Sequence, residues 1–270
     1  MKRRIRAKSR EGSALIAVVF TLLIAATITA SLTGGTRSDL ELSHNYELQF
    51  QSELASEAGI AAAILSLSDP AAGAPLTNGQ DFPLTVNSRP LRVSIQNEAG
   101  KINLNHKPNP LLKRLIESVC PAASGAPQLW NAIEASLSAA KVGEKAFLRV
   151  DQIGRLPGAS ETLVTAIGPY VSVYSFREVP DFGLAAPKLQ ALMSEGGNAT
   201  GLASAQSQRG APQAAMAGVF TIRATALENT APLPLEAVVY ITGDPGQPYR
   251  ILDWRQRPWL DAADCEGGRS

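Results

Sequence analysis

Cysteine and histidine are scarce in this chain, and that scarcity excludes several kinds of site. Among 270 residues there are two cysteines, Cys120 and Cys265, and two histidines, His44 and His106. A zinc site built on paired cysteines is therefore excluded. In an oxidising compartment the two cysteines can pair, but sequence does not show that they come within bridging distance. We expect two unpaired thiols.

Signatures of catalysis are lacking as well. Neither histidine has a cysteine or a pair of carboxylates at a useful spacing, and no glycine-rich phosphate-binding loop precedes a predicted helix. We expect no enzyme activity, no catalytic residue and no cofactor.

Basic charge is scarce outside the first twelve residues. The chain has a formal net charge of +1, of which residues 1–12 contribute +5 from six basic groups and Glu11, so residues 13–270 sum to −4. A protein that binds nucleic acid needs a basic footprint to displace counterions from the phosphates. We therefore expect no nucleic acid as a partner.

An uncharged, mostly apolar run over residues 13–36 follows this basic leader. As a helix, the run is long enough to cross the roughly 30 Å hydrocarbon core at about 1.5 Å per residue, and the leader favours a cytoplasmic N-terminus. We expect a single-pass inner-membrane protein with a periplasmic head. Three interpretations stay open: a removable signal peptide, a plain signal anchor, or a prepilin leader cut between Gly12 and Ser13.

The helix is predicted to continue past the membrane over residues 37–67, because no proline or turn cluster interrupts it. Apolar residues recur there at helical spacing and predict a buried stripe: Phe50, Leu54, Ala58, Ala61 and Leu65. Asp69 and Pro70 end the helix, and residues 71–80 form a loop.

Strand patterns lie on both sides of a helical block. The predicted parts are the first sheet segment with a hairpin over residues 81–107, a helical subdomain over 108–194, a flexible loop over 195–216, further strands over 217–256 and a C-terminal tail over 257–270. This order predicts an α+β fold. The long N-terminal helix packs on an antiparallel sheet, and the all-helical subdomain is inserted between the sheet strands.

Three separated stretches carry distinctive residues. They are Gly12 with the apolar start that follows it, the run Asn-Glu-Ala-Gly-Lys-Ile-Asn-Leu-Asn at residues 97–105, and residues 150–171, which pass through Leu-Pro-Gly to Pro-Tyr-Val. Together they resemble the minor pseudopilin K family of type II secretion systems, over residues 12–254. The second stretch is the most specific, because a generic strand does not need glycine, lysine and two spaced asparagines.

The second stretch is expected to be architectural. We predict a turn at Gly100 with asparagines that face solvent. The motif residues are Glu98, Gly100, Lys101, Asn103 and Asn105.

Ala17 occupies the fifth position after the expected cleavage site. Ordinary pilins carry glutamate there, and the resemblance implies that this glutamate pairs with the N-terminal amine of a neighbouring subunit. An unpaired carboxylate in a bilayer costs several kcal/mol. Ala17 therefore favours a subunit at the filament tip, although a signal anchor that was never a pilin predicts the same residue.

The turn Leu156-Pro157-Gly158 resembles a helix-hairpin-helix, a motif that binds DNA phosphates through backbone amides. Residues 141–175 hold four basic and three acidic side chains, which gives little drive for DNA binding. We expect the turn to serve packing. A membrane-anchored periplasmic DNA receptor remains the alternative function.

Members of the family often hold calcium in the helical insert through an acidic cluster, commonly near an Asp-Trp pair. The matching residues 132–145 contain too few carboxylates, and we expect Asp253 at a strand end with Trp254 packed. We predict no bound metal.

The resemblance implies a non-catalytic minor pseudopilin at the tip of the pseudopilus. It would initiate and cap filament assembly for the export of folded proteins across the outer membrane. Its implied partners are the I-type and J-type minor pseudopilins, a prepilin peptidase and the inner membrane.

Overall fold

The computed structural model describes residues 11–69, 75–107, 109–120, 125–141, 143–195, 217–227 and 234–256, and within this set it does not describe the side chains of 11–13 and 30–40. The first ten residues of the expected leader, nearly all of the flexible loop expected over residues 195–216 and the tail expected over residues 257–270 lie outside the described residues. The chain divides into two units, Met1–Gln51 and Ser52–Ser270. Each is described by itself.

A single helix, α1 (Glu11–Ser68), begins in the first unit and ends in the second. It confirms the prediction of one uninterrupted helix to about residue 67. Ala17 lies on α1 with its side chain exposed. Within the described residues, no helix combines the length and the apolar content needed to cross a membrane.

The second unit contains a five-stranded antiparallel sheet in the order β1-β2-β5-β6-β7. Its strands are β1 (Asn78–Val86), β2 (Arg89–Asn97), β5 (Gly218–Ala226), β6 (Leu235–Ile241) and β7 (Tyr249–Gln256). Asn87 and Ser88 both have positive φ, 50° and 64°, which suits the tight hairpin between β1 and β2. The hairpin and the three later strands confirm the strand predictions. Strand β1 begins three residues earlier than expected, since residues 78–80 were assigned to the loop over residues 71–80.

The last part of α1 packs on one face of this sheet, but through a different stripe from the one predicted. Its buried apolar side chains join a core with residues of β2, β5 and β6; they are Ala55, Ile60, Ala63, Ile64 and Leu67. The expected stripe is wrong: Leu54 is 47% and Leu65 is 68% exposed, and Phe50, which belongs to the first unit, is 61% exposed.

Close approach explains the change of face. A Cβ atom at Gly59 would lie 2.9 Å from Leu91 Cδ1 and 3.2 Å from Ala224 Cβ. The helix therefore contacts β2 and β5 along a line of small residues, where backbone and sheet come together. A pattern that scores large apolar residues misses such a face.

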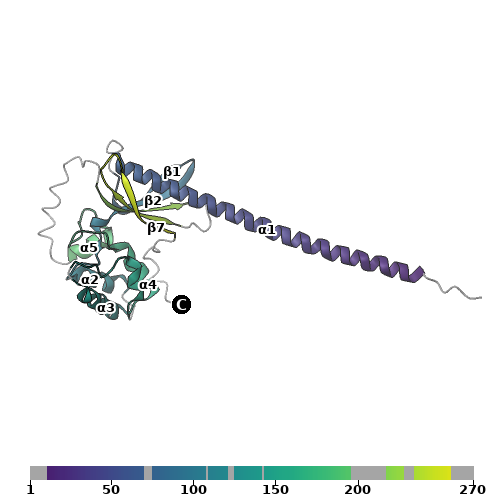
Figure 1. Ribbon diagram of the computed structural model, residues 1–270, viewed down its shortest axis with the longest axis horizontal. Coiled ribbons are helices and arrows are strands. Elements are labelled where there is room, and N and C mark those ends of the chain that lie inside the picture. Colours follow the sequence, from purple (N-terminus) through teal and green to yellow (C-terminus); the bar gives the residue numbers. More distant parts are fainter. Residues whose placement is uncertain are drawn as a thin grey trace, which may run out of the picture. The chain divides into compact units, whose positions relative to one another are not determined.

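A helical subdomain lies between β2 and β5 in the chain and has its own core. Its elements are α2 (Pro110–Val119), α3 (Ala126–Ala139), η3 (Val150–Arg155), α4 (Glu161–Ile167) and α5 (Pro187–Glu195). The core is apolar throughout and includes Leu115, Leu129, Ile133, Ile153, Leu163 and Ile167, all without exposed surface. In Figure 1 these helices lie on the side of the sheet away from the last part of α1.

Side-chain caps start two of these helices. The Asn109 side chain accepts a hydrogen bond from Leu112 N at the start of α2, and Ser160 Oγ accepts one from Leu163 N at the start of α4. Such caps satisfy backbone N–H groups that have no partner within the helix.

A short parallel pair joins the two ends of this subdomain's main part. Strand β3 (Ile102–Asn103) pairs with β4 (Val171–Ser172), and Leu104 N donates to Ser172 O at 2.8 Å. Two of the three distinctive stretches, residues 97–105 and 150–171, are thus brought side by side.

Candidate functional site

The motif at residues 97–105 forms the junction at which the chain leaves the sheet and enters the helical subdomain. Strand β2 ends at Asn97, whose side chain accepts from Ala99 N at 2.9 Å and starts the turn η2 (Glu98–Gly100). After Lys101 the chain enters β3. The turn expected at Gly100 is present as η2 and redirects the chain.

Gly100 is packed tightly inside this junction. A Cβ atom there would lie 2.2 Å from Leu184 O and 2.8 Å from Ala185 N, both backbone atoms. Backbone atoms cannot rotate aside as a side chain can, so the position accepts only glycine without a local shift. Next to it, Asp181 N donates to Ala99 O at 2.8 Å.

Asn103 and Asn105, which were expected to face solvent, are half-buried, and their side chains bind backbone groups. Asn103 Oδ1 accepts from Asn105 N at 2.9 Å, and the Asn105 side chain is partly buried against Phe147. Asn105 Nδ2 donates to Phe147 O at 2.9 Å and Asn105 Oδ1 accepts from Phe147 N at 2.8 Å. One amide thus satisfies both backbone groups of a residue 42 positions away. Ile102 and Leu104, expected to face inward, are fully buried.

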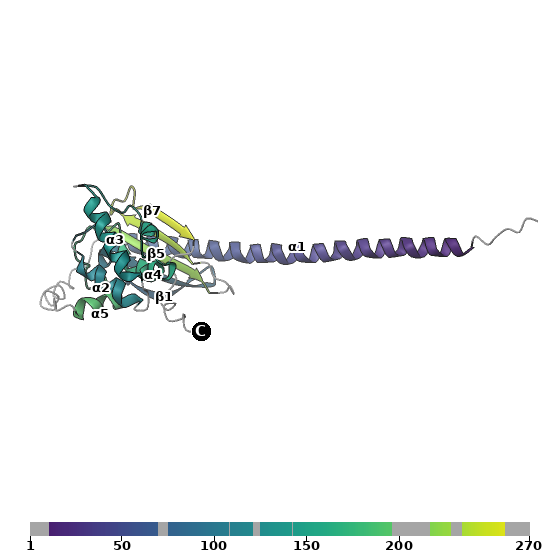
Figure 2. The same ribbon diagram turned by 90° about the horizontal axis from the view of Figure 1, so that it is seen from below.

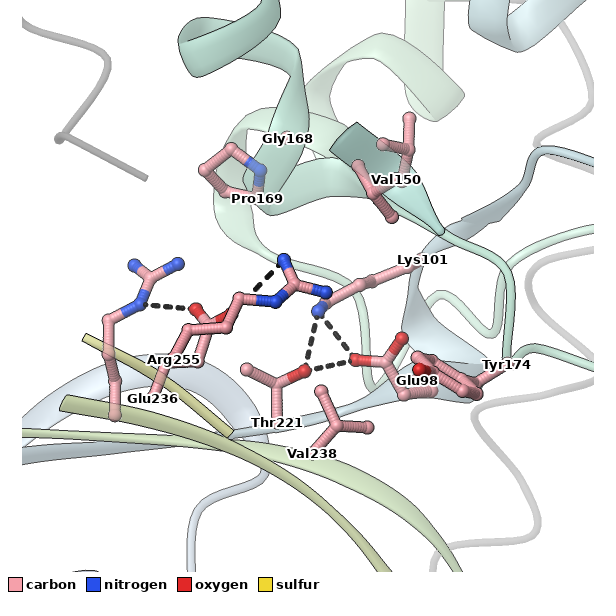
Figure 3. A pocket seen from close by; sticks show the side chains of 12 residues that line it. Glu98, Lys101, Val150, Gly168, Pro169, Tyr174, Thr221, Glu236, Val238 and Arg255 are labelled. Carbon is pink, nitrogen blue, oxygen red and sulfur yellow. Dashed lines mark hydrogen bonds and ion pairs between the residues drawn. The ribbon is translucent and has the colours of Figure 1, made fainter. Parts of the chain in front are cut away.

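Glu98 and Lys101 form a buried ion pair at the centre of the junction. Lys101 Nζ lies 2.5 Å from Glu98 Oε1 and donates to Thr221 Oγ1 at 3.0 Å, while Thr221 Oγ1 donates to Glu98 Oε1 at 2.5 Å. The side chains of Glu98 and Lys101 are 3% and 9% exposed. Figure 3 shows the three groups facing one another. Because Thr221 belongs to β5, this cluster fastens the junction to the middle of the sheet.

Further ion pairs continue from this cluster across the same face of the sheet. Glu236 on β6, 4% exposed, lies between Arg223 (3.1 Å) and Arg255 (3.8 Å), and Arg255 also pairs with Asp253. Asp253 in turn lies 3.8 Å from Arg149 NH1, at the start of η3. The chain of charges therefore connects the sheet to the helical subdomain.

Burial and neighbouring charges shift the pKa values of Tyr174 and Arg149, which lie beside these ion pairs. Burial raises the pKa of Tyr174, and the Asp253 carboxylate raises it further. The hydrogen bond to Asp151 raises the pKa of Arg149, with Asp253 adding to the effect. A cavity of about 20 Å³ lies among Glu98, Lys101, Tyr174, Thr221, Glu236 and Arg255. That volume holds about one water molecule, so the region is a packed junction, too small to admit an organic substrate.

The Leu-Pro-Gly turn packs against α3. Gly158 has a φ of 84°, and a Cβ atom there would lie 2.5 Å from both Gly125 O and Leu129 N. Leu156 is half-buried against the core of the subdomain, whereas Pro157 is exposed. The turn therefore approaches the start of α3 through its glycine.

Gly12 and Ser13, which flank the expected cleavage site, belong to α1, and the structure does not describe the Ser13 side chain. Within the described residues, no group of three or more His, Cys, Asp or Glu side chains could hold a metal ion.

The expectation of two free thiols is wrong for Cys120. This residue follows α2, is 5% exposed and is disulfide-bonded. The chain's other cysteine, Cys265, lies outside the described residues.

Sequence reasoning missed the charged residues of the sheet. A signal was present: Thr221 and Arg223 alternate with apolar residues along β5, and Glu236 is the one charged residue of the apolar strand β6, a pattern that marks a second face of the sheet that also carries contacts. It also misjudged the Asp-Trp pair. Strand β7 continues to Gln256, Asp253 is an ion-paired residue within it, and Trp254 is 40% exposed instead of packed.

Comparison with known proteins gives a likeness in structure but none in sequence. No family model matches the chain, and no curated protein matches its sequence. Among solved structures, the chain is similar to one chain of the GspK-GspI-GspJ complex from the type 2 secretion system of enterotoxigenic Escherichia coli. The sequence identity is 15% and the TM-score 0.46, over 82% of this chain and 98% of that chain.

Proposed function

We propose that this chain is a minor pseudopilin of the K type, which takes its place at the tip of a type II secretion pseudopilus and has no catalytic role. The observation that carries the proposal is an apolar stripe on α1 that the sheet leaves uncovered. The proposal also rests on the resemblance of the three distinctive stretches to that family.

The stripe consists of Leu54, Ala58, Ala61 and Leu65, on the side of α1 opposite the buried residues. Leu54 and Leu65 are 47% and 68% exposed. A helix that is apolar on two opposite faces is suited to burial from both sides. One face already packs on the sheet, so the second is available to the helix of another subunit.

Residues 13–36 would provide the membrane-bound part of the same helix. A prepilin peptidase would cut between Gly12 and Ser13, and the retained helix would hold the protein in the inner membrane until assembly. Ala17, in place of a glutamate, suits a subunit that has no neighbour to pair with on one side.

The helical subdomain would give the tip its shape. The junction residues Glu98 and Lys101 fix the entry of the subdomain to the sheet through their buried contacts with Thr221, so the subdomain would move with the sheet as one body. Its bulk would prevent a further subunit from stacking above. Packing with the I-type and J-type minor pseudopilins would then start filament assembly and support export of folded proteins.

Co-purification with the I-type and J-type partners of the same organism tests the proposal. We expect all three proteins to be recovered together from detergent-solubilised membranes. Leu54→Glu combined with Leu65→Glu should reduce recovery of the partners at least tenfold, because two charges would be buried between helices. Leu148→Glu is the control, since Leu148 is a leucine of the helical subdomain that is 66% exposed, close to the 68% of Leu65.

Two results would contradict the proposal. One is unchanged recovery of both partners with the doubly substituted stripe. The other is an intact mass of the membrane-extracted protein that begins beyond residue 36, or that still begins at Met1 when the peptidase is present.

A further inference from the structure

Strand β7 is an edge strand of the sheet in the part of the chain that the structure describes. Within the described residues it pairs only with β6, and the sheet ends there. Figures 1 and 2 show β1 and β7 at opposite sides of the sheet. An edge strand presents a row of backbone donors and acceptors to any extended chain that reaches it.

The opposite edge of the sheet, strand β1, is protected against pairing with a further strand, unlike β7. Strand β1 contains Pro83 and an irregularity between Asn78 and Asp81, two features that discourage pairing. Its apolar residues Phe82 and Leu84 are partly buried against the core beneath α1. Strand β7 is eight residues long without a proline.

A bulge gives β7 an apolar face at its edge. The register passes from Val238↔Asp253 to Val239↔Ile251, so Leu252 is an extra residue. Bulges of this kind redirect the side chains that follow. Here the bulge places Trp254 on the same face as Tyr249 and Ile251, whereas strict alternation would turn it to the other face.

These three side chains are left open to solvent. Tyr249, Ile251 and Trp254 are 43%, 46% and 40% exposed, although they face the same side of the sheet as the residues of β6 that are buried under α1. A further strand beside β7 would cover them. Cross-strand pairs of aromatic and β-branched residues are among the contacts that stabilise sheets most.

The charged residues of β7 differ in whether they have an ion-pair partner. On the other face of β7, Asp253 and Arg255 are already engaged in ion pairs with each other and with residues of the sheet and η3. Arg250 is exposed, and no acidic group of the described residues pairs with it. The edge therefore offers one positive charge beside an apolar patch.

We propose that β7 accepts an extended segment of a partner protein as an added strand. That segment carries apolar or aromatic residues on the face toward Tyr249, Ile251 and Trp254, and an acidic residue opposite Arg250. Main-chain hydrogen bonds provide the affinity, and these side chains provide the selectivity. The inference goes beyond the proposed function, because it depends neither on membrane insertion nor on the stripe of α1.

Selection from a displayed library of short random peptides tests the proposal on the full chain in detergent. We expect the enriched peptides to alternate apolar and acidic residues. A synthetic peptide from this set should slow hydrogen exchange in β7 while exchange at the β1 edge stays unchanged. Trp254→Thr should weaken its binding at least fivefold.

A charge exchange provides the sharper measurement. Arg250→Glu should weaken binding of the acidic peptide about fivefold, since a favourable cross-strand pair becomes a like-charge pair. It should also improve binding of the same peptide with lysine in place of its acidic residue. Arg177→Glu, a change at another exposed arginine of the second unit, should alter neither affinity.

Four results would overturn the proposal. The first is protection from exchange that falls outside β7, and the second is binding that Arg250→Glu and Trp254→Thr leave unchanged. The third is a dimer of this chain that Arg250→Glu or Trp254→Thr dissociates. The fourth is peptide binding that requires removal of residues 257–270. The partner recovery described above is a separate measurement, so failure of one proposal leaves the other standing.

Discussion

Replacement of Asn105 by alanine should destabilise the helical subdomain. Among the uncharged polar residues of the motif, this position should be the most sensitive to substitution. The Asn105 amide makes two hydrogen bonds to the backbone of Phe147, at 2.8 and 2.9 Å, and Phe147 is 3% exposed. Asn105→Ala removes both bonds and leaves a buried N–H and C=O without their partner.

The magnitude follows from these contacts. Each of the two lost hydrogen bonds costs about 1–2 kcal/mol, in the lower part of the range for a buried backbone group that is left without its partner. We therefore expect a loss of about 2–4 kcal/mol in the free energy of unfolding. For a folded unit of this size that corresponds to a fall of about 5–12 °C in the melting temperature.

Scanning calorimetry of the full chain in detergent measures this fall. Hydrogen exchange should locate the loss in residues 143–150 and along β3. Asn131→Ala is the matched control, because Asn131 lies exposed on α3 and the substitution there should be neutral or slightly stabilising. A melting temperature for Asn105→Ala equal to that of Asn131→Ala would refute the assignment of a structural role to this amide.

Three further predictions concern buried charge, pH and the disulfide. Lys101→Met should lower the free energy of unfolding by about 3–5 kcal/mol in denaturant titrations, because Glu98 is left as an unpaired buried charge. Combining Lys101→Met with Glu98→Leu should restore most of the loss. A double variant as unstable as the single one would contradict this reasoning. Tyr174 has a raised pKa in the folded chain, so the unfolded chain releases the phenol proton first, and stability should fall as the pH rises above about 10. Tyr174→Phe should fall less in melts recorded between about pH 9 and pH 11, and identical profiles would speak against the assignment. Cys120 should be recovered linked to Cys265 in peptide maps of unreduced protein, and reduction should lower the melting temperature, since closing a loop of about 100 residues or more contributes about 4–5 kcal/mol; alkylation of Cys265 without reductant would disprove the pairing.

Local patterns predicted the elements of this fold well. The strands around Leu91 and Ile222 were found because alternation of apolar and polar residues is a property of neighbouring positions. Helices α2 and α4 were predicted from the spacing of their apolar residues, which is also a local property, and the caps at Asn109 and Ser160 agree with them.

Contacts between distant positions were beyond such reasoning. The bond between Lys101 and Thr221 joins residues 120 positions apart, and Asn105 meets Phe147 over 42 positions. The residue types of the motif are visible in the sequence, but their partners are not. The packing face of α1 was missed for another reason: Gly59 and its small neighbours allow close approach, and hydrophobic periodicity gives them little weight.

The pairing of β3 with β4 also affects how the gene could be rearranged. Residues 104–170 begin and end at one place on the head, where two short strands hold the entry and the exit together. A block bounded in this way can be exchanged for another, or shortened, without stretching the chain that remains. Transplanting these residues into another sheet domain would therefore carry α2, α3, η3 and α4 in one step, with Ile102 and Val171 as the splice points, whereas α5 would have to be moved separately.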